Sequence, residues 1–322
     1  MSTLEIIDYL GPDWTRCREL IRQSLHTDVG LLEKTNEMLL SRTGKQLRPI
    51  LSLLSARLIS QPNEDSLRLA ASAEILHNAT LMHDDVADES KERRGAPTLS
   101  ALLGPNAAVL VGDYWLARAV EMVLSTSCFE KVIPLFSRTL TDLAEGEMLQ
   151  LEKASSLDTC EEDYLRIIFC KTASLFVASV KGAAISVSAS PAQLEAVEQY
   201  AKALGVAFQI KDDILDYTGD KRLGKPVGVD LKEKKITLPL LGALRNADAP
   251  NEIREMVGRI DKQEGAYEQL MAFVHEGGGI EYATRQLDAW IQKAERALDV
   301  FPDSQAKTFL IEIAYYNSSR TI

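Results

Sequence analysis

The chain has 322 residues, 46% of them hydrophobic and 26% charged, which is the balance of an ordinary folded protein with a large core. This composition excludes a disordered chain, a collagen and a small disulfide scaffold. The formal net charge of −11 argues against a protein whose main partner is nucleic acid or an anionic membrane. With only 18 Gly and 11 Pro, the chain has few turns for its length, which favours long helices.

The cysteines and the N-terminus favour a reducing compartment. The 4 cysteines are scattered without short paired spacings, so no disulfide framework is expected. The first ten residues carry Glu5 and Asp8 and lack a basic region followed by an apolar one, which argues against a secretory signal. The longest uncharged run, 95–112, is broken by glycine and proline and is too irregular to span a membrane. We therefore predict a cytoplasmic protein without an integral membrane segment.

Apolar residues recur at spacings of three and four along most of the chain, which predicts helices. Residues 69–86 and 164–187 are apolar on nearly all sides and are predicted to be central, buried helices. Residues 280–298 carry one apolar stripe, as expected for a surface helix. Sustained strand alternation is absent. Because no linker-like composition divides the chain, we predict one large all-α domain over 1–322.

Two copies of the sequence Asp-Asp-x-x-Asp, at 84–88 and 212–216, end two apolar helical stretches. On a helix, the first and last aspartates of each copy share a face, and the middle one is rotated to the side. Crowded carboxylates favour a bound cation, and hard oxygen ligands suit magnesium that also binds substrate phosphates. A solvated acidic turn is the alternative for either copy alone. The predicted magnesium ligands are Asp84, Asp85, Asp88, Asp212, Asp213 and Asp216.

Basic residues in glycine-containing segments accompany both acidic motifs. They are Lys45 and Arg48 in 44–49, Arg93 and Arg94 after the first motif, and Lys225 and Lys235 after the second. Arginine can bind phosphate oxygens in pairs, and lysine acts as a point charge. Carboxylates, magnesium and basic side chains together predict a diphosphate site.

These motifs closely resemble those of the trans-isoprenyl diphosphate synthases. The resemblance runs in order through Gly44–Pro49, His77, Leu81–Asp88, Arg93–Gly95, Lys171–Thr172, Phe208–Asp216, Gly224–Lys225 and Lys235–Thr237. It departs from the usual pattern at Gln46, where arginine is more common. The resemblance implies an isoprenoid synthase-type fold, with long helices around a central elongated apolar cavity. It also implies a homodimer and three magnesium ions that hold the allylic diphosphate.

The same resemblance implies a head-to-tail condensation of isopentenyl diphosphate with an allylic diphosphate such as farnesyl diphosphate. The diphosphate leaves, the double bond of isopentenyl diphosphate attacks the allylic cation, and loss of a proton gives a trans double bond. The implied catalytic residues are Asp84, Asp85, Asp88, Arg93, Lys171, Asp212 and Lys225. The implied contacts are Arg93, Lys171, Thr172, Gln209, Lys225 and Lys235 at the allylic site, and Lys45, Arg48, His77 and Arg94 at the isopentenyl site. Lys171 lies in an otherwise apolar stretch, where an unpaired ammonium would be unfavourable, and a bound diphosphate would explain it.

Three other functions fit the sequence less well. The doublet His83-Asp84 also occurs in metal-dependent phosphohydrolases, but a chain with 4 histidines is short of ligands for that chemistry. A terpene cyclase usually has a different second motif. A non-catalytic subunit of a heteromeric synthase would show erosion of one motif, and both are complete here.

Product length would depend on the helix before the first motif. A tail running from Asp84 toward the start of that helix would pass Thr80, Ala79, Leu76 and Ala73, the last about 16 Å away at about 1.5 Å per residue. Short-chain members carry a bulky aromatic at one of the first two positions, so alanine and threonine predict a long-chain product. The expected floor lies near Met122, Val123, Leu135 and Phe136. A geranylgeranyl or shorter product, with Ala79 merely a small residue at a helix crossing, remains the alternative.

Three further expectations concern a lid, the C-terminus and product release. The glycine- and lysine-rich segment 217–239 is a candidate lid over the diphosphate, with a solvated linker as the alternative. Arg320 resembles a terminal arginine that reaches isopentenyl diphosphate in some relatives. Because a long product is strongly apolar, transient membrane contact at release is also expected.

Overall fold

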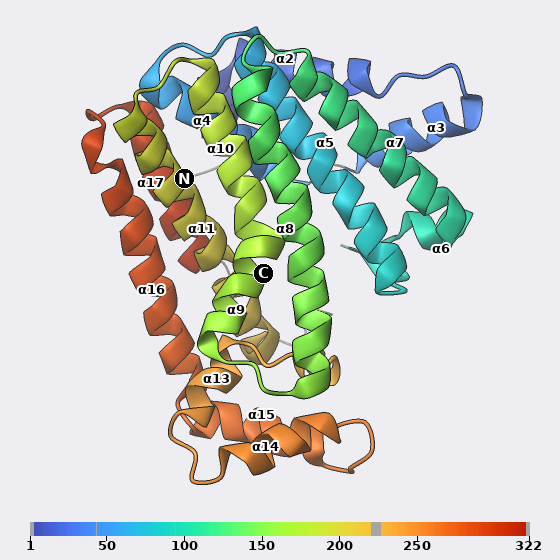
Figure 1. The fold of residues 1–322 in the computed structure, drawn as a ribbon, viewed down its shortest axis with the longest axis vertical. Coiled ribbons are helices and arrows are strands. Elements are labelled where there is room, and N and C mark those ends of the chain that lie inside the picture. Colours follow the sequence, from blue (N-terminus) through green and yellow to red (C-terminus); the bar gives the residue numbers. More distant parts are fainter. Residues whose placement is uncertain (1–2, 43, 94, 220–226, 320–322) are drawn as a thin grey trace. The chain divides into compact units, whose positions relative to one another are not determined.

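The fold is almost entirely helical, as a computed structural model of residues 3–42, 44–93, 95–219 and 227–319 describes it (Figure 1). Within these residues the only strands are β1 (Glu92–Arg93) and β2 (Ala96–Pro97), which pair antiparallel as a small hairpin. The predicted all-α fold is therefore confirmed. Contacts group the chain into unit 1 (1–137, 177–197 and 301–310) and unit 2 (138–176, 198–300 and 311–322).

Unit 1 is organised around the long helix α5, which packs against α2, α4, α6 and α7. Figure 1 shows α5 beside α7 along much of its length. The helices that lie wholly in this unit are α1 (Thr3–Leu10), α2 (Pro12–Ser24), α3 (Gly30–Ser41), α4 (Leu47–Ile59), α5 (Glu64–Ala87), α6 (Leu99–Leu103) and α7 (Pro105–Leu124). Four helices contribute residues to both units: α8 (Phe129–Ser156), α10 (Ser174–Ser186), α11 (Pro191–Thr218) and α17 (Gln305–Ser319).

Helix α5 begins at a capping box and is buried on most sides. The Ser66 amide donates to Asn63 Oδ1 at 2.9 Å, and the Asn63 amide donates to Ser66 Oγ at 3.1 Å. These two bonds satisfy backbone donors that a helix start would otherwise leave unpaired. The residues from Leu69 to Leu76 are all buried. The prediction of a central buried helix over 69–86 is thereby confirmed for its first half, and exposure increases toward the acidic motif.

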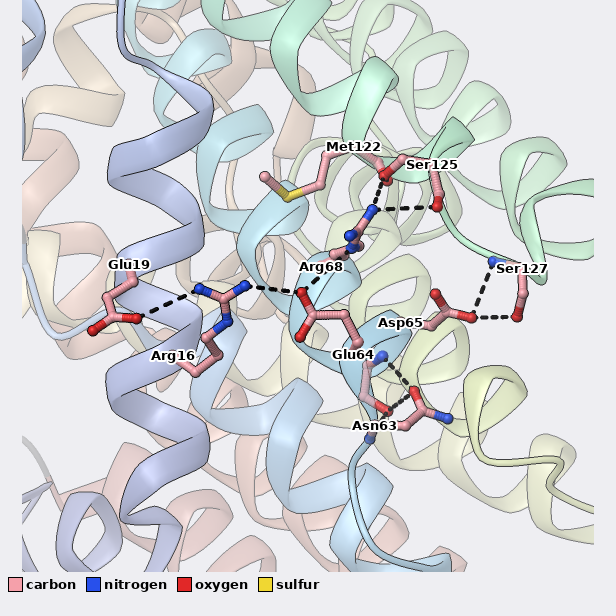
Figure 2. A network of polar contacts seen from close by, with 10 residues as sticks. Arg16, Glu19, Asn63, Glu64, Asp65, Arg68, Met122, Ser125 and Ser127 are labelled. Carbon is pink, nitrogen blue, oxygen red and sulfur yellow. Dashed lines mark hydrogen bonds and ion pairs between the residues drawn. The ribbon is translucent and has the colours of Figure 1, made fainter.

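A charged network fixes the start of α5 to its neighbours (Figure 2). Arg16 of α2 pairs with Glu64 at 3.2 Å, and Arg68 Nη1 donates to Ser125 Oγ at 2.8 Å, just after α7. Arg68 also lies 3.7 Å from Glu64. The network therefore links three helices at the end of α5 that is remote from the aspartates.

Unit 2 consists of shorter helices together with parts of α8, α10, α11 and α17. Its own elements are α9 (Glu161–Ile168), the π-helical turn η1 (Phe169–Ala173), α12 (Val229–Lys232), α13 (Leu238–Leu244), α14 (Pro250–Gly258), α15 (Ala266–Glu276), α16 (Gly279–Ala297) and the 3-10 turn η3 (Leu298–Val300). Helix α16 packs against α13 and α15. It buries Ala283, Leu287, Ile291 and Ala294, which confirms the amphipathic stripe predicted over 280–298.

The predicted buried helix over 164–187 is interrupted by the π-turn. A π-turn holds one extra residue, so it changes the direction of side chains along a helix, and such turns are frequent at functional sites. Here the turn carries Lys171 and Thr172. The run 161–186 is long and apolar enough to cross a membrane by composition, but 72% of its most apolar window is buried inside the protein, as in a core helix.

Two glycines let neighbouring helices approach the π-turn closely. A Cβ atom added at Gly146 of α8 would lie 2.6 Å from the Cβ of Cys170. One added at Gly205 of α11 would lie 2.6 Å from the Cα of Ala173. Both distances are too short for real carbon contacts, so the turn that carries Lys171 depends on glycine on two sides.

Candidate functional site

The first aspartate motif ends α5 in unit 1. Asp84 and Asp85 lie in its last turn, and Asp88 follows as the C-cap, where its amide donates to the Asp84 carbonyl at 2.8 Å. Asp84 and Asp88 are exposed, whereas Asp85 is buried. The predicted rotation of the middle carboxylate away from the other two is therefore observed.

Asp85 is occupied by a contact within the protein. Arg93, in the hairpin that follows the motif, donates from Nε to Asp85 Oδ1 at 2.7 Å. The Asp85 side chain is 8% exposed and that of Arg93 is 36% exposed. This ion pair fixes the first of the two arginines beside the motif. Arg94 lies outside the described residues.

A close helix crossing holds the residue before the motif. A Cβ at Gly112 of α7 would collide with His83 Nε2, so glycine leaves room for the imidazole in its present position. The same nitrogen lies 3.2 Å from Asp113 Oδ1. His83 thus contacts α7, and this contact gives it a packing role beside Asp84.

The residues predicted to bind isopentenyl diphosphate are spread over α5 and the start of α4. Lys45 is exposed just before α4, and Arg48 and His77 are half-buried. The Arg48 carbonyl accepts a hydrogen bond of 3.2 Å from the Ser179 hydroxyl, which connects this turn to α10.

The face of α5 that was predicted to set the product length is largely covered by other protein atoms. Ala73, Leu76 and Ala79 are buried, and Thr80 is half-buried, with its hydroxyl donating to the His77 carbonyl at 2.9 Å. Of the four residues expected at the floor, Met122, Val123 and Phe136 are buried and Leu135 is half-buried.

The second aspartate motif lies within α11 in unit 2, and its middle residue is enclosed by hydrogen bonds. The Tyr164 hydroxyl donates to Asp213 Oδ2 at 2.6 Å, and Gln209 Nε2 donates to Asp213 Oδ1 at 2.9 Å. The Thr172 hydroxyl in turn donates to Gln209 Oε1 at 3.0 Å. Asp212 is half-buried on the same helix. Both motifs therefore bury their middle aspartate and engage it with another side chain.

The last residue of the second motif anchors the start of α12. Asp216 Oδ1 accepts from the Val229 amide at 3.0 Å, and Oδ2 accepts from the Asp230 amide at 3.1 Å. The Gly228 amide donates to the Asp216 carbonyl at 2.8 Å. Part of the predicted lid over 217–239 is thereby attached directly to the motif. Lys225 lies outside the described residues, and so does the rest of 220–226.

One cavity of about 170 Å³ in unit 2 collects several of the predicted side chains. Those predicted from the sequence are Lys171, Gln209, Asp213 and Lys235. Those not predicted are Gln150, Lys153, Thr159, Tyr164, Asp230 and Thr237. Asp230 could have been suspected because it is an acidic residue inside the lysine-rich segment after the second motif. Tyr164 carries no such signal, since it reads as one apolar residue at the start of a buried helix.

The two cavity lysines that were predicted from the sequence have acidic partners. Lys171 forms an ion pair with Glu147 of α8, and Lys235 forms one with Glu233. A bound diphosphate is therefore not needed to explain Lys171, because α8 supplies a carboxylate that the sequence alone does not place beside it. Both ammonium groups are partly exposed.

Carboxylates are crowded at this end of the cavity. Burial, followed by repulsion from neighbouring aspartates, raises the pKa of Asp213 and of Asp230. Burial also raises the pKa of Asp216, although the amide bonds at its oxygens oppose this. A cation bound beside these carboxylates would favour their ionised forms.

The acidic residues are better suited to a metal ion that binds together with the substrate than to a metal site formed by the protein alone. Within the described residues, no three acidic, histidine or cysteine side chains converge closely enough to hold a metal ion alone. Magnesium, however, is commonly held by one or two carboxylates together with substrate phosphates. The exposed pair Asp84 and Asp88, on one face of the α5 terminus, suits that mode.

Comparison with known proteins gives a consistent result. The sequence profile of the family described as Polyprenyl synthetase matches residues 29–274. An octaprenyl diphosphate synthase from Haemophilus influenzae is 37% identical over 323 residues, which cover 99% of this chain and 98% of the relative. An all-trans-nonaprenyl-diphosphate synthase from Rhodobacter capsulatus, described as geranyl-diphosphate specific, is 37% identical over 315 residues, with 96% and 95% covered.

Solved structures of similar proteins have the same fold. A decaprenyl diphosphate synthase from Rhodobacter capsulatus superimposes with a TM-score of 0.92 at 36% identity, and all of both chains is covered. A polyprenyl synthase from Caulobacter crescentus, solved with calcium and isoprenyl diphosphate, gives a TM-score of 0.90 at 34% identity, with 100% and 98% covered.

Proposed function

Because the chain belongs to the polyprenyl synthetase family, we propose that it condenses isopentenyl diphosphate head-to-tail with an allylic diphosphate, such as farnesyl diphosphate, to give a long-chain all-trans polyprenyl diphosphate. The observation that carries this proposal is the cavity in unit 2, where two lysines and a glutamine predicted to contact the diphosphate converge. Relatives named octaprenyl, nonaprenyl and decaprenyl synthases support a product longer than geranylgeranyl diphosphate.

In the proposed reaction, unit 2 holds the allylic diphosphate. Lys171 and Lys235 contribute positive charge, and Gln209 contributes an amide N–H. Thr172 lies in the same π-turn as Lys171 and fixes the Gln209 amide. The departing diphosphate accepts the proton that is lost after condensation, so no side chain is needed as a base. Lys225 has the same proposed role as Lys235.

Unit 1 contributes the first aspartate motif and the basic residues around it. Arg93 contacts the allylic diphosphate while Asp85 holds it in place. Lys45, Arg48, His77 and Arg94 bind isopentenyl diphosphate. Because this second substrate is also an anion, arginine and lysine are suitable partners for its oxygens.

The proposed magnesium ligands are chiefly Asp84 and Asp88 in unit 1 and Asp212 in unit 2, for three ions in all. Magnesium held there would supply positive charge to the departing diphosphate. A supporting role is proposed for the aspartates whose oxygens already accept hydrogen bonds from the protein, which are Asp85, Asp213 and Asp216. The calcium and isoprenyl diphosphate in the Caulobacter crescentus structure support a metal and diphosphate site in this family.

We further propose that the protein works as a homodimer, with both units of each chain forming one domain. Three apolar side chains on α6 and α7 support a partner surface: Leu102, Leu103 and Leu110 are 45%, 43% and 69% exposed. Covering such residues with a second copy would remove apolar surface from water. The proposed location is the cytoplasm, with transient membrane contact when the apolar product leaves.

The decisive experiment incubates purified protein with magnesium, labelled isopentenyl diphosphate and farnesyl diphosphate, and sizes the products. A ladder that extends beyond geranylgeranyl diphosphate supports the proposal, and products that stop at geranylgeranyl diphosphate favour the shorter-chain alternative. Phosphate release without condensation favours a phosphohydrolase. Activity that appears only with a second synthase favours a non-catalytic subunit.

A matched pair of lysine variants locates the activity in the cavity. Lys171→Gln removes a charge from the cavity and should lower turnover strongly. Lys262→Gln removes a charge from an exposed site outside it and should leave turnover unchanged. Equal activity of both variants would contradict the proposed site.

A further inference from the structure

A chain of three hydrogen bonds runs behind the cavity in unit 2. It starts at the Tyr164 hydroxyl on α9, passes through both oxygens of Asp213 and the Gln209 amide on α11, and ends at Thr172 in the π-turn. The distances are 2.6, 2.9 and 3.0 Å. The chain therefore connects three helical segments that line one cavity.

Tyr164 is placed to act only as a donor in this chain. Its side chain is buried, with 3% of the residue exposed, and Asp213 is 4% exposed. The Tyr164 O–H is its one donor, and Asp213 Oδ2 accepts it at 2.6 Å. A bond of this kind to a buried acidic group is stronger than one between neutral groups.

The chain fixes which way the Gln209 amide points. Its carbonyl oxygen accepts from Thr172, and one of its two N–H groups donates to Asp213. A glutamine amide has two N–H donors, so one of them remains for a ligand in the cavity that Gln209 lines. If Asp213 turned away, the amide could rotate and present its oxygen, which repels an anion, to the same position.

We propose that Tyr164 is a positioning residue: its hydroxyl holds the Asp213 carboxylate, and that carboxylate orients the Gln209 amide toward the allylic diphosphate. Because its hydroxyl is bonded to Asp213, Tyr164 acts in this arrangement through two other side chains. The inference rests on the proposed function, because it assigns Tyr164 a role at that same site.

The test compares wild type with Tyr164→Phe, which keeps the buried ring and removes only the hydroxyl. We expect the KM for farnesyl diphosphate to rise about tenfold, the size expected for loss of one hydrogen bond to a charged group. The kcat should stay within about twofold, and the KM for isopentenyl diphosphate should not change, because Gln209 contacts only the allylic substrate. Calorimetric titration with inorganic diphosphate and magnesium should give the same weakening without turnover.

A double-mutant cycle tests whether the effect passes through Gln209. In the Gln209→Ala background, adding Tyr164→Phe should have little further effect on either KM or diphosphate binding. The matched control is Tyr200→Phe, which removes the hydroxyl of a buried tyrosine on α11 outside the cavity. This control should leave both KM values unchanged even if it lowers the free energy of unfolding.

Two results would overturn the inference. One is an unchanged KM for farnesyl diphosphate in a folded Tyr164→Phe variant, and the other is the same loss with and without Gln209. If Tyr164→Phe does not fold, Asp213→Asn interrupts the same chain and should give the same rise in KM. Failure of the proposed function would look different, since the wild-type protein would then form no polyprenyl product at all.

Discussion

Replacing Gly205 with alanine tests how tightly the π-turn is held against α11. The added Cβ would lie 2.6 Å from the Cα of Ala173, 2.7 Å from its Cβ and 3.2 Å from a ring carbon of Phe176. The first of these neighbours is backbone, so it cannot move aside by changing a rotamer. The helix and the π-turn must therefore separate, and Lys171 and Thr172 must move with the turn.

The magnitude follows from two opposing effects. Overpacking of a buried contact typically destabilises a protein by about 1–3 kcal/mol. Alanine is favoured over glycine inside a helix by up to about 1 kcal/mol. We therefore expect Gly205→Ala to lower the free energy of unfolding by about 1–2 kcal/mol. Displacement of Lys171 should also lower kcat/KM for the allylic substrate by more than this loss of stability would cause.

Urea unfolding is the assay, and Gly182→Ala is the matched control. Gly182 is also a buried glycine inside a helix. A Cβ added there, however, would lie 3.5 Å from Val132 Cγ1 and 3.6 Å from Phe136 Cε2. These are ordinary contacts, so helix propensity should dominate and stabilise the variant by about 0.5–1 kcal/mol. Equal free energies of unfolding for Gly205→Ala and Gly182→Ala would contradict the close approach of α11 to the π-turn.

Three further predictions concern product length, metal and pH. Ala79→Tyr should shorten the product to farnesyl length, and an unchanged product ladder would contradict the proposed path along α5. Chelation of magnesium should abolish condensation, and Asp84→Ala should raise the magnesium concentration for half-maximal activity more than Asp85→Ala, because Asp85 is occupied by Arg93. Burial tends to raise the pKa of Asp163, but the Cys160 amide and Lys153 outweigh it and lower the pKa from 3.8 to about 2. The resulting stability is present above about pH 4 and is lost as the pH falls toward 2, so Asp163→Asn should cost about 1 kcal/mol at pH 7 after allowance for solvent screening. The difference in the free energy of unfolding between wild type and Asp163→Asn, measured with urea, should become smaller as the pH is lowered. A difference that does not change with pH would argue against the ion pair between Lys153 and Asp163.

The sequence predicted those features that depend on local periodicity. The rotation of Asp85 away from the face shared by Asp84 and Asp88 follows from the helical repeat alone. The stripe of α16 follows for the same reason. Four of the residues predicted to bind substrate or metal also line one cavity. They could be predicted because they lie in motifs that resemble those of a known family.

The features that could not be predicted depend on contacts between distant segments. Glu147 neutralises Lys171 from another helix, and no spacing in the sequence connects the two. The π-turn depends on close approach at Gly146 and Gly205, since nothing in 169–173 distinguishes it from an ordinary helix. Tyr164 was missed for the same reason, because its partner lies on α11.

The ion pairs at the start of α5 have a consequence for how far a product can grow. A hydrocarbon tail that extends along this helix from Asp84 would reach Arg68 after about 24 Å, at about 1.5 Å per residue. There it would meet Glu64 and Arg16, which are paired with each other and partly hydrated. Further growth would bury charged groups against an alkyl chain, which is unfavourable. If the product grows along α5 as proposed, these ion pairs would limit its length by electrostatics in addition to side-chain bulk.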